Sequence, residues 1–531
     1  MSDSPSVETL KDALSTPSAY PHEPAQITFE QTHISLIALA PPWVYKIKKP
    51  VSLSFLDFST LERRRHFCEQ EVRLNQRLAP DTYEDVVPIV ETDAGLRVDA
   101  DPAAGEVVEV AVKMRYLNPS HFFDARLARG EASASDIDRV VRTLCAFYQS
   151  RPSRPEVAEA GRIDRLRAVT EENFAEAEDQ VGTLLSQAAH DALAFYADRF
   201  YDLNASLLHR RRARGYVVEG HGDLRLEHVH LTDERVAIFD CVEFNDEFRY
   251  LDVANDVAFL AMDLDVHGHP DLSQRFVTRM AHGLGDADLP TLINFYKCQR
   301  AQVRGKVGGL RAAEDEVPPR EQARSRAQAR HHYQWALRYA VAGSRPLVVA
   351  VMGRPGTGKS TQAEALAQAL GWPHLASDRI RKTRAGMPLH GRADADAHNR
   401  LYTDTLTETT YATLRQRALQ HARRHRGTVL DATFSAPAQR EQFRSALRAA
   451  DVPYVFIELT AEDAVLKRRL RKRSSGTATA SDARAEDFEP LSARYEAPEA
   501  LEDPQHIQIS TETSPEDTTL AILKALIRLE H

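Results

Sequence analysis

Apolar and polar positions follow different periods in different parts of this 531-residue chain. Within residues 27–117, short apolar runs with a two-residue period predict β-strands, and one charged stretch with apolar positions at helical spacing predicts a helix. The predicted strands lie within residues 27–49, 86–90 and 109–117, and the predicted helix covers residues 61–78. The first part of the chain is therefore predicted to form a small sheet with one long helix.

Helical periodicity dominates the following part, residues 118–332. Apolar side chains recur three and four positions apart, most clearly over residues 136–149 and 189–212. Two short apolar segments that end in polar residues, residues 217–224 and 236–244, interrupt this pattern. One interpretation is that these two segments pair with each other as a hairpin.

From residue 347 onward, apolar strands alternate with helical segments. This alternation predicts a doubly wound parallel sheet, because each parallel strand needs a crossover connection that returns the chain to the same edge. The predicted strands cover residues 347–352, 427–430, 454–459 and 506–510. The predicted helices cover residues 360–370, 391–425, 437–449, 461–472 and 515–529.

The chain is too long for one ordinary hydrophobic core, so two or three domains are expected. A short segment with Gly, Ser and Pro near residues 343–346 is the natural place for a boundary. We predict a polar N-terminal segment over residues 1–25, a first domain over residues 26–340 and a second domain over residues 344–531. A helical linker over residues 314–343 closes the first domain.

Composition and charge exclude several classes of protein. The chain is 43% apolar and 27% charged, as soluble globular proteins are, and its net charge of −9 argues against a dedicated nucleic-acid binder. The four cysteines, Cys68, Cys145, Cys241 and Cys298, are far apart, so we expect buried thiols and neither disulfides nor a zinc site. Neither a signal-peptide pattern nor an apolar run of about 18 residues is present, so we expect a cytoplasmic protein without a membrane partner.

The strongest chemical signal is a glycine-rich loop between a predicted strand and a predicted helix. Residues 353–360 fit the pattern G-x-x-x-x-G-K-[ST], whose backbone N–H groups hold the phosphates of a nucleotide. Lys359 would reach the β- and γ-phosphates, and Ser360 or Thr361 would hold Mg²⁺. The expected nucleotide contacts are Gly353, Arg354, Pro355, Gly356, Thr357, Gly358, Lys359, Ser360 and Thr361. ATP and Mg²⁺ are thus the predicted cofactors; a turn that merely joins strand to helix is the alternative.

Two aspartates follow later segments of the same domain. Asp378 precedes Arg381 by three positions, and Asp431 ends the predicted strand 427–430. A carboxylate near the γ-phosphate can accept a proton late in a loose phosphoryl transfer, and Asp431 would face Mg²⁺ or substrate. A helix cap for Asp378 and a plain strand-end turn for Asp431 remain open as alternatives.

A basic stretch over residues 467–473 carries Arg469 and Arg473 on one helix face. A cationic lid would stabilise charge in the transition state and exclude water, whereas a solvated basic face is the alternative. Together with the loop, these features resemble the small P-loop kinases, namely gluconate and shikimate kinases and the kinase domain of polynucleotide kinase. The resemblance implies that Asp378 acts as base or contacts the accepting hydroxyl, that Arg381 holds substrate, and that both lid arginines close on the phosphates.

A second set of candidate residues lies in the first domain. Asp223 follows one short apolar segment and Asp240 ends the next, which is the layout of kinase-like phosphotransfer. Asp223 would take the proton from a substrate hydroxyl, and Asp240 would hold Mg²⁺ on the phosphates. Such a site needs a strand lysine paired with a helix glutamate, and Lys46 and Glu71 are suitably ordered. Lys48, on the same strand face as Lys46, is the second choice for the lysine.

Residues 27–310 resemble the aminoglycoside phosphotransferase and choline kinase family. The stretch H-G-D-L-R-L-E-H-V over residues 221–229 carries the resemblance, together with I-F-D at residues 238–240. The family implies a protein-kinase-like bilobal fold, an adenine contact at Met114 and a loop braced by His221. It has a metal-binding Asn where this chain has His228, and a His where this chain has Arg225. Imidazole is a poor Mg²⁺ ligand, so a kinase-shaped domain that binds nucleotide weakly or not at all remains open as the alternative.

The predicted fold class is therefore an α+β, protein-kinase-like bilobal domain followed by an α/β P-loop domain with a doubly wound parallel sheet. We expect an ATP-dependent phosphotransferase that moves the γ-phosphate of ATP to a hydroxyl of a small polar molecule. A nucleic-acid 5′-hydroxyl end is the second substrate option. The alternative is a regulatory nucleotide-binding protein, in which the first domain senses a ligand or partner and the P-loop domain is a slow switch ATPase.

Overall fold

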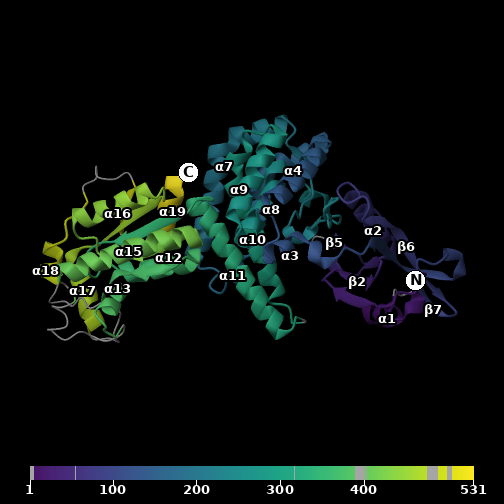
Figure 1. The fold of residues 1–531 in the computed structure, drawn as a ribbon, viewed down its shortest axis with the longest axis horizontal. Coiled ribbons are helices and arrows are strands. Elements are labelled where there is room, and N and C mark those ends of the chain that lie inside the picture. The colour runs from purple at the N-terminus through teal and green to yellow at the C-terminus, as the bar shows by residue number, and fades with distance from the viewer. Residues whose placement is uncertain are drawn as a thin grey trace. The chain divides into compact units, whose positions relative to one another are not determined.

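The computed structural model describes residues 5–53, 56–315, 317–388, 401, 403–474, 488–498 and 505–530 (Figure 1). The chain divides into two compact units. One comprises Met1–Leu166 and Asn204–Lys297, and the other comprises Arg167–Leu203 and Cys298–His531. The domain limits inferred from the sequence stay a prediction.

The first unit contains a six-stranded antiparallel sheet with strand order β1-β2-β3-β8-β6-β7. Its strands are β1 (Thr28–Gln31), β2 (Ser35–Ala40), β3 (Trp43–Lys48), β8 (Glu106–Arg115), β6 (Tyr83–Thr92) and β7 (Gly95–Val98). The predicted strands of this region are confirmed, and β7 is an addition. Alternation of side chains along β3 places Lys46 and Lys48 on one face of the sheet, because successive residues of a strand point to opposite faces.

Helix α2 (Leu61–Asn75) packs against β6 and β8. It begins at Thr60, whose side chain accepts a hydrogen bond from the N–H of Arg63 and so satisfies one free donor of the first turn. Its buried face includes Arg64 and Glu71, which are charged. A buried charge needs a partner, so these two residues determine how the helix can sit on the sheet.

The remainder of the first unit is mainly helical. Its helices are α1 (Val7–Ala13), α3 (Phe123–Ala128), α4 (Ala134–Gln149), α5 (Pro155–Ala158), α8 (Val253–Val266) and α9 (Pro270–Leu284). Its short strands are β4 (Ser52–Leu53), β5 (Leu56–Asp57), β9 (Val217–Glu219), β10 (Val229–Leu231), β11 (Val236–Ile238) and β12 (Tyr250–Asp252). The hairpin suggested between the two apolar segments is wrong, since β9 pairs with β12 and β11 pairs with β10.

Three helices, α6 (Ile163–Glu176), α7 (Gln187–Ala213) and α10 (Leu289–Arg311), contribute residues to both units. Helix α11 (Pro319–Ala342) belongs to the second unit. Among the helices that the structure describes, none combines the length and the apolar character needed to cross a membrane. All four cysteines are buried and free, as the sequence predicts.

The second unit carries the predicted parallel sheet (Figure 1, green to yellow). Its strand order is β14-β15-β13-β16-β17, and every neighbouring pair is parallel. The strands are β13 (Leu347–Met352), β14 (His374–Ala376), β15 (Gly427–Asp431), β16 (Tyr454–Thr460) and β17 (His506–Ser510). Burial of all six residues of β13 agrees with its central place, because both faces of such a sheet are covered.

Helices connect these strands as the alternating pattern predicts. They are α12 (Lys359–Leu370), α13 (Ser377–Arg384), α15 (Asp404–His425), α16 (Pro437–Ala449), α17 (Asp463–Ser474), α18 (Phe488–Ala493) and α19 (Pro515–Glu530). One apolar core joins α15 and α16 to alternate residues of the central strand, including Val348 and Ala350. The predicted helical stretch 391–425 is observed from Asp404 onward, and residues 391–400 lie outside the described residues.

Arg64 fixes α2 to the sheet through Glu109 of β8. The Arg64 side chain is fully buried; its Nε lies 2.9 Å from Glu109 Oε2, and its Nη1 donates to the carbonyl of Phe58. We predict that Arg64→Ala lowers the free energy of unfolding by about 3–5 kcal/mol, because it leaves Glu109 buried without its counter-charge. Urea unfolding measures the loss, and Arg65→Ala, an exposed neighbour on α2, is the matched control. Equal effects of the two variants would contradict this assignment.

Candidate functional site

The glycine-rich loop connects the end of β13 to the first residue of α12. Gly353, Gly356 and Gly358 have φ angles of 137°, 84° and 88°, which side chains other than glycine rarely adopt. A Cβ atom on Gly353 would also lie 2.4 Å from the carbonyl oxygen of Leu459. The loop therefore requires these glycines, and its backbone leads directly into the N-terminus of a helix, where anions are favoured.

Side chains of the loop fold back on its own backbone. Thr357 Oγ1 and Lys359 Nζ each lie 2.9 Å from the carbonyl oxygen of Arg354 and donate to it. The Arg354 guanidinium pairs with Asp463 at the start of α17, with 2.6 Å between Nη2 and Oδ1. Pro355 is buried, whereas Ser360 and Thr361 are exposed. The ammonium group of Lys359 is thus held against the loop that the motif assigns to phosphate.

Asp431 lies beside this loop, at the end of β15. It pairs in the sheet with Val351, just before the loop, and its side chain lies near Ser360 and Lys359. Burial raises the pKa of Asp431 above its ordinary value, although Lys359 and the Ser360 hydroxyl oppose this shift. Asp431 ends its strand as predicted, and its predicted contact with Mg²⁺ or substrate stays a prediction.

The oxygen donors of Ser360 and Asp431 suit Mg²⁺. This ion prefers one or two protein oxygen ligands and takes the remainder from phosphate and water. No group of three or more His, Cys, Asp or Glu residues among the described residues is arranged to hold a metal. An ion at this place would therefore depend on a bound nucleotide for several of its ligands.

Asp378 and Arg381 lie in α13, which follows the edge strand β14. Arg381 Nη1 lies 3.0 Å from Asp378 Oδ1, and the Asp378 carboxylate lies close enough to Asp431 to raise its pKa further. The helix begins after Ala376 without a side-chain cap, so Asp378 does not serve as the N-cap that was its alternative role. The charges of Asp378, Arg381 and Asp431 also act on the pKa of the nearby Tyr411 hydroxyl. The oxygen of this hydroxyl accepts a hydrogen bond from the N–H of Phe434.

The two arginines predicted to form a lid are Arg469 and Arg473, and the structure describes the side chain of Arg469. Arg469 Nη1 donates to Thr511 Oγ1 at 2.8 Å, and Nη2 donates to the Thr511 carbonyl, so its side chain fastens α17 to the residue after β17. The side chain of Arg473 lies outside the described residues. A contact of either arginine with phosphate stays a prediction.

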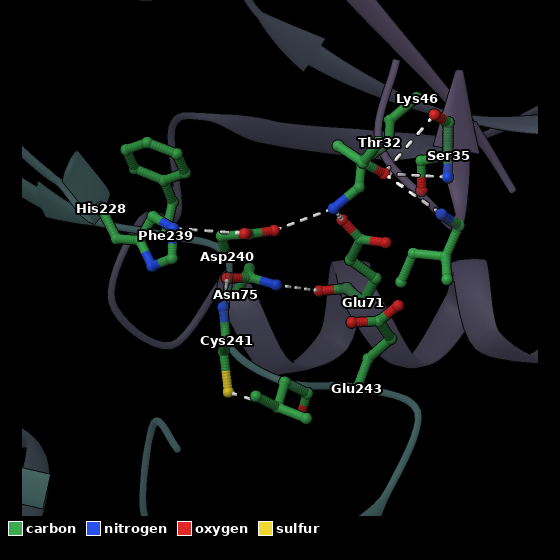
Figure 2. A network of polar contacts seen from close by, with 12 residues as sticks. Thr32, Ser35, Lys46, Glu71, Asn75, His228, Phe239, Asp240, Cys241 and Glu243 are labelled. Atoms are coloured by element: carbon green, nitrogen blue, oxygen red, sulfur yellow. Dashed lines mark hydrogen bonds and ion pairs between the residues drawn. The ribbon is translucent and has the colours of Figure 1, made fainter. Parts of the chain in front are cut away.

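The second set of candidate residues converges in the first unit (Figure 2). Lys46 Nζ lies 2.8 Å from Glu71 Oε1 and 2.8 Å from Asp240 Oδ1, which confirms the predicted pairing of Lys46 with Glu71. Figure 2 shows the Asp240 carboxylate between Lys46 on one side and His228 on the other, with 3.4 Å between His228 Nε2 and Asp240 Oδ2. Three elements far apart in sequence thus meet around one carboxylate.

Each charge of this network changes the pKa of its neighbours. Burial alone would lower the pKa of Lys46, but Asp240 and Glu71 hold it well above its ordinary value. Burial likewise favours the neutral form of Glu71, yet Lys46 and Lys48 keep its pKa below 4.5. Desolvation of Asp240 is opposed by Lys46 and His228, which lower its pKa. Lys46, Glu71 and Asp240 are therefore charged at neutral pH.

Asp223 lies on the other side of His228. The imidazole Nδ1 is 2.9 Å from the Asp223 carbonyl oxygen and 3.6 Å from its carboxylate, so His228 stands between Asp223 and Asp240. Arg225 Nε donates to Asp223 Oδ2 at 3.0 Å. The two residues that depart from the family pattern, His228 and Arg225, thus both contact the carboxylates to which the pattern assigns chemistry.

The backbone around these carboxylates is firmly held. Asp240 has a left-handed φ of 61°, a strained conformation that is concentrated at functional sites. Asp256 accepts hydrogen bonds from the N–H groups of His221 and Gly222, and the His221 ring bridges Asp223 N–H and the Phe239 carbonyl. Bracing of the loop by His221 is confirmed. Met114 lies near the end of β8, and its contact with adenine stays a prediction.

The sequence did not identify Glu243 and Tyr411. Glu243 accepts a hydrogen bond from Lys48, which also donates to Glu71 Oε2 at 2.7 Å, so a second lysine–carboxylate pair lies behind the first. Its position, three residues after Asp240, is a feature of the sequence that could have indicated its place in the site. Tyr411 is one of several aromatic residues in a helical pattern, and no local feature distinguishes it.

The chain is similar to several known proteins. The family model described as AAA domain matches residues 348–498. Uncharacterized proteins of Mycobacterium tuberculosis and Mycobacterium bovis are 30% identical over 476 residues, which cover 88% of this chain and 90% of theirs. A gluconokinase from Sinorhizobium meliloti is 21% identical over 35% of this chain and 95% of its own, with a TM-score of 0.26. A putative kinase from Chloroflexus aurantiacus is 22% identical over 35% and 98%, with a TM-score of 0.27.

The lowered pKa of Glu71 makes a prediction about stability. A carboxyl whose folded pKa lies below its unfolded value stabilises the protein above the unfolded pKa, and this stabilisation disappears as pH falls through the folded pKa. We predict that Glu71→Gln costs about 3–5 kcal/mol of unfolding free energy at pH 7, since it removes the anion shared by two lysines. The cost should shrink as pH falls below the ordinary glutamate pKa and through the lowered pKa of folded Glu71, as the carboxyl group becomes protonated.

Chemical denaturation at several pH values measures this difference. Glu69→Gln, an exposed glutamate on the same helix, is the matched control and should change stability little at any pH. A cost for Glu71→Gln that stays constant down to pH 3 would show that the network does not hold Glu71 in its charged form.

Proposed function

We propose that this chain, which belongs to the same family as the uncharacterized mycobacterial proteins, is an ATP-dependent phosphotransferase. The second unit would transfer the γ-phosphate of ATP to a hydroxyl of a small polar molecule, with ADP as the other product. The observation that carries the proposal is the convergence of Lys359, Ser360, Asp378 and Asp431 at the carboxyl edge of a parallel sheet. Ligands of open α/β sheets bind at that edge.

Each residue has a distinct part in the proposed transfer. The N–H groups of the loop and the Lys359 ammonium group bind the phosphates, and the three glycines keep the backbone close enough to do so. Ser360 and Asp431 would hold Mg²⁺, which when bound neutralises charge on the phosphates. Asp378 accepts the proton of the attacking hydroxyl, while the oxygen forms a bond to phosphorus and the bond to ADP breaks.

Arg381 is suited to hold the acceptor. Its guanidinium is largely buried and bonds Asp378, so a substrate bound by Arg381 would lie with its hydroxyl next to the proposed base. A planar guanidinium recognises carboxylate or phosphate with paired hydrogen bonds. A polar acceptor with an anionic group, such as a sugar acid, fits this arrangement.

For the first unit we propose the bilobal kinase-like fold of the aminoglycoside phosphotransferase and choline kinase family. The Lys46–Glu71 pair supports this proposal, as does the placement of Asp223 and Asp240 on the two sides of His228. One observation favours a second role for this unit, as a regulatory nucleotide-binding module. Asp223 is paired with Arg225 and Asp240 is paired with Lys46, so basic side chains already hold both carboxylates.

A transfer screen tests the proposed activity. Full-length protein is incubated with γ-labelled ATP and Mg²⁺, together with pooled sugar acids and other hydroxylated metabolites, aminoglycosides, or oligonucleotides with a 5′-hydroxyl end. We expect label to appear on a small hydroxylated acceptor. Release of free phosphate without any labelled acceptor would contradict the phosphotransferase and support a switch ATPase.

Asp378→Asn separates binding from chemistry. An amide cannot accept the hydroxyl proton, so we predict that transfer falls by about 10²–10⁴-fold while ATP affinity changes little. Single-turnover transfer and ATP titration measure the two quantities. Asp451→Asn, at an exposed residue of the same unit, is the matched control. Unchanged transfer by the Asp378→Asn variant would exclude Asp378 as the base.

Lys359→Ala distinguishes the two candidate sites. We predict that it abolishes ATP turnover in the second unit and leaves the fold intact, because Lys359 contacts the loop backbone and not an apolar core. Any turnover that remains in the Lys359→Ala protein belongs to the first unit, and Asp223→Ala in that background must then remove it. A folded Lys359→Ala protein with no residual turnover would favour the regulatory role for the first unit; residual turnover that survives Asp223→Ala would contradict the assignment of both sites.

A further inference from the structure

A cavity of about 750 Å³ opens in the first unit beside α2. Its lining combines residues of that helix with the segment after α4, the end of β9 and residues 243–250. Four arginines contribute to the lining: Arg73, Arg151, Arg154 and Arg249. A volume of this size accommodates a small molecule.

Positive charge exceeds negative charge around this cavity. Glu219 is shared by four guanidiniums, and the nitrogen–oxygen distances are 3.4 Å to Arg77, 3.4 Å to Arg249, 3.7 Å to Arg154 and 3.8 Å to Arg73. These distances exceed those of good charge-assisted hydrogen bonds. Glu219 alone at such distances does not satisfy the guanidiniums of Arg73 and Arg154, which therefore retain N–H donors for another anion.

Arg249 provides a second, independent indication. Its side chain is only 2% exposed, yet its Nε has no hydrogen-bond acceptor among the described residues. Its other two nitrogens contact Asp246, Glu219 and the carbonyls of Val242 and Asn245. A buried guanidinium N–H without an acceptor is costly, so the surroundings of Arg249 favour further negative charge in the cavity that this residue lines.

Arg151 contributes a further guanidinium, and among the described residues it forms no ion pair with a carboxylate. It donates to the Ser150 hydroxyl and stacks on the ring of Phe147, and burial together with the positive charge of Arg77 lowers its pKa. Glu243, although it is part of the lining, is already bonded to Lys48. Glu243 and Asp246 of the wall are thus paired with Lys48 and Arg249, whereas Arg73, Arg151 and Arg154 have only long or solvent-exposed contacts with carboxylates, or none.

We propose that this cavity is a binding site for a small phosphorylated molecule, held by Arg73, Arg151, Arg154 and Arg249. Guanidiniums on several sides of a small cavity suit the oxygens of a phosphate or pyrophosphate group, since each planar fork can donate two hydrogen bonds to one phosphate. The site is distinct from the proposed transfer centres, and its occupation does not require phosphotransfer by either unit.

Isothermal titration of the full-length Lys359→Ala protein with pyrophosphate tests the proposal, because this background removes the binding expected at the glycine-rich loop. We expect saturable binding that malonate reproduces only weakly and that potassium chloride of equal ionic strength does not reproduce. Arg73→Ala and Arg151→Ala should each weaken binding about tenfold or more, as expected for the loss of one charge-assisted interaction.

Arg65→Ala is the matched control, an exposed arginine on α2 outside the lining, and it should leave the affinity unchanged. Thermal melting confirms that each variant is folded, and the charge-retaining Arg151→Lys variant should bind better than Arg151→Ala. The proposal is overturned if pyrophosphate does not bind, if all arginine variants bind equally well, or if Arg65→Ala weakens binding as much as Arg151→Ala. None of these readouts depends on catalysis, so a protein without transfer activity can still show the site.

Discussion

Glu71 joins two lysines at a place where solvent does not reach. The side chains of Glu71 and Lys48 are fully buried, and Lys46 is 13% exposed, so none of the three could remain charged there without the others. The pairing links β3, which carries both lysines, to α2, which carries Glu71. Asp240 and Glu243, from the segment after β11, complete the network. The network consequently fixes both the position of α2 on the sheet and the position of Asp240.

The second unit also buries a carboxyl group, but it does so with fewer charged neighbours. Asp431 is buried at the end of β15, and Ser360 and Lys359 of the neighbouring loop are its partners. Lys359 is also bonded to the Arg354 carbonyl. Binding of a triphosphate would replace that contact by a stronger one with an anion. In the first unit, by contrast, the lysine already has two carboxylate partners, so a nucleotide there must compete with Asp240 for Lys46.

The sequence predicted those features of the sites that depend on local backbone geometry. The glycine pattern at residues 353–358 could be read because three positive φ angles demand it, and the strands and helices around it have strong periodicity. The Lys46–Glu71 pair could be inferred from the order of strand and helix. The link from Arg469 to Thr511 could not be inferred, because it joins residues 42 positions apart whose approach depends on β17. The pairing of β9 with β12 was missed for the same reason: short strands pair where the surrounding helices place them, and the nearest apolar segment is not always the partner.

The arginine-lined cavity follows from the same network of buried charges. Glu243 is bonded to Lys48, and the fully buried Glu71 is bonded to Lys46 and Lys48, so these two carboxylates do not neutralise the arginines of the cavity. Arg73 and Arg154 are about half exposed, and water can solvate their excess charge at little cost. Arg249 is buried and cannot be solvated in that way; backbone carbonyls of the loop after β11 and two carboxylates hold it instead. The proposed anion site therefore has one buried arginine, Arg249, behind a solvated rim of arginines, an arrangement in which an anion would enter from water and lose its hydration only at the last step.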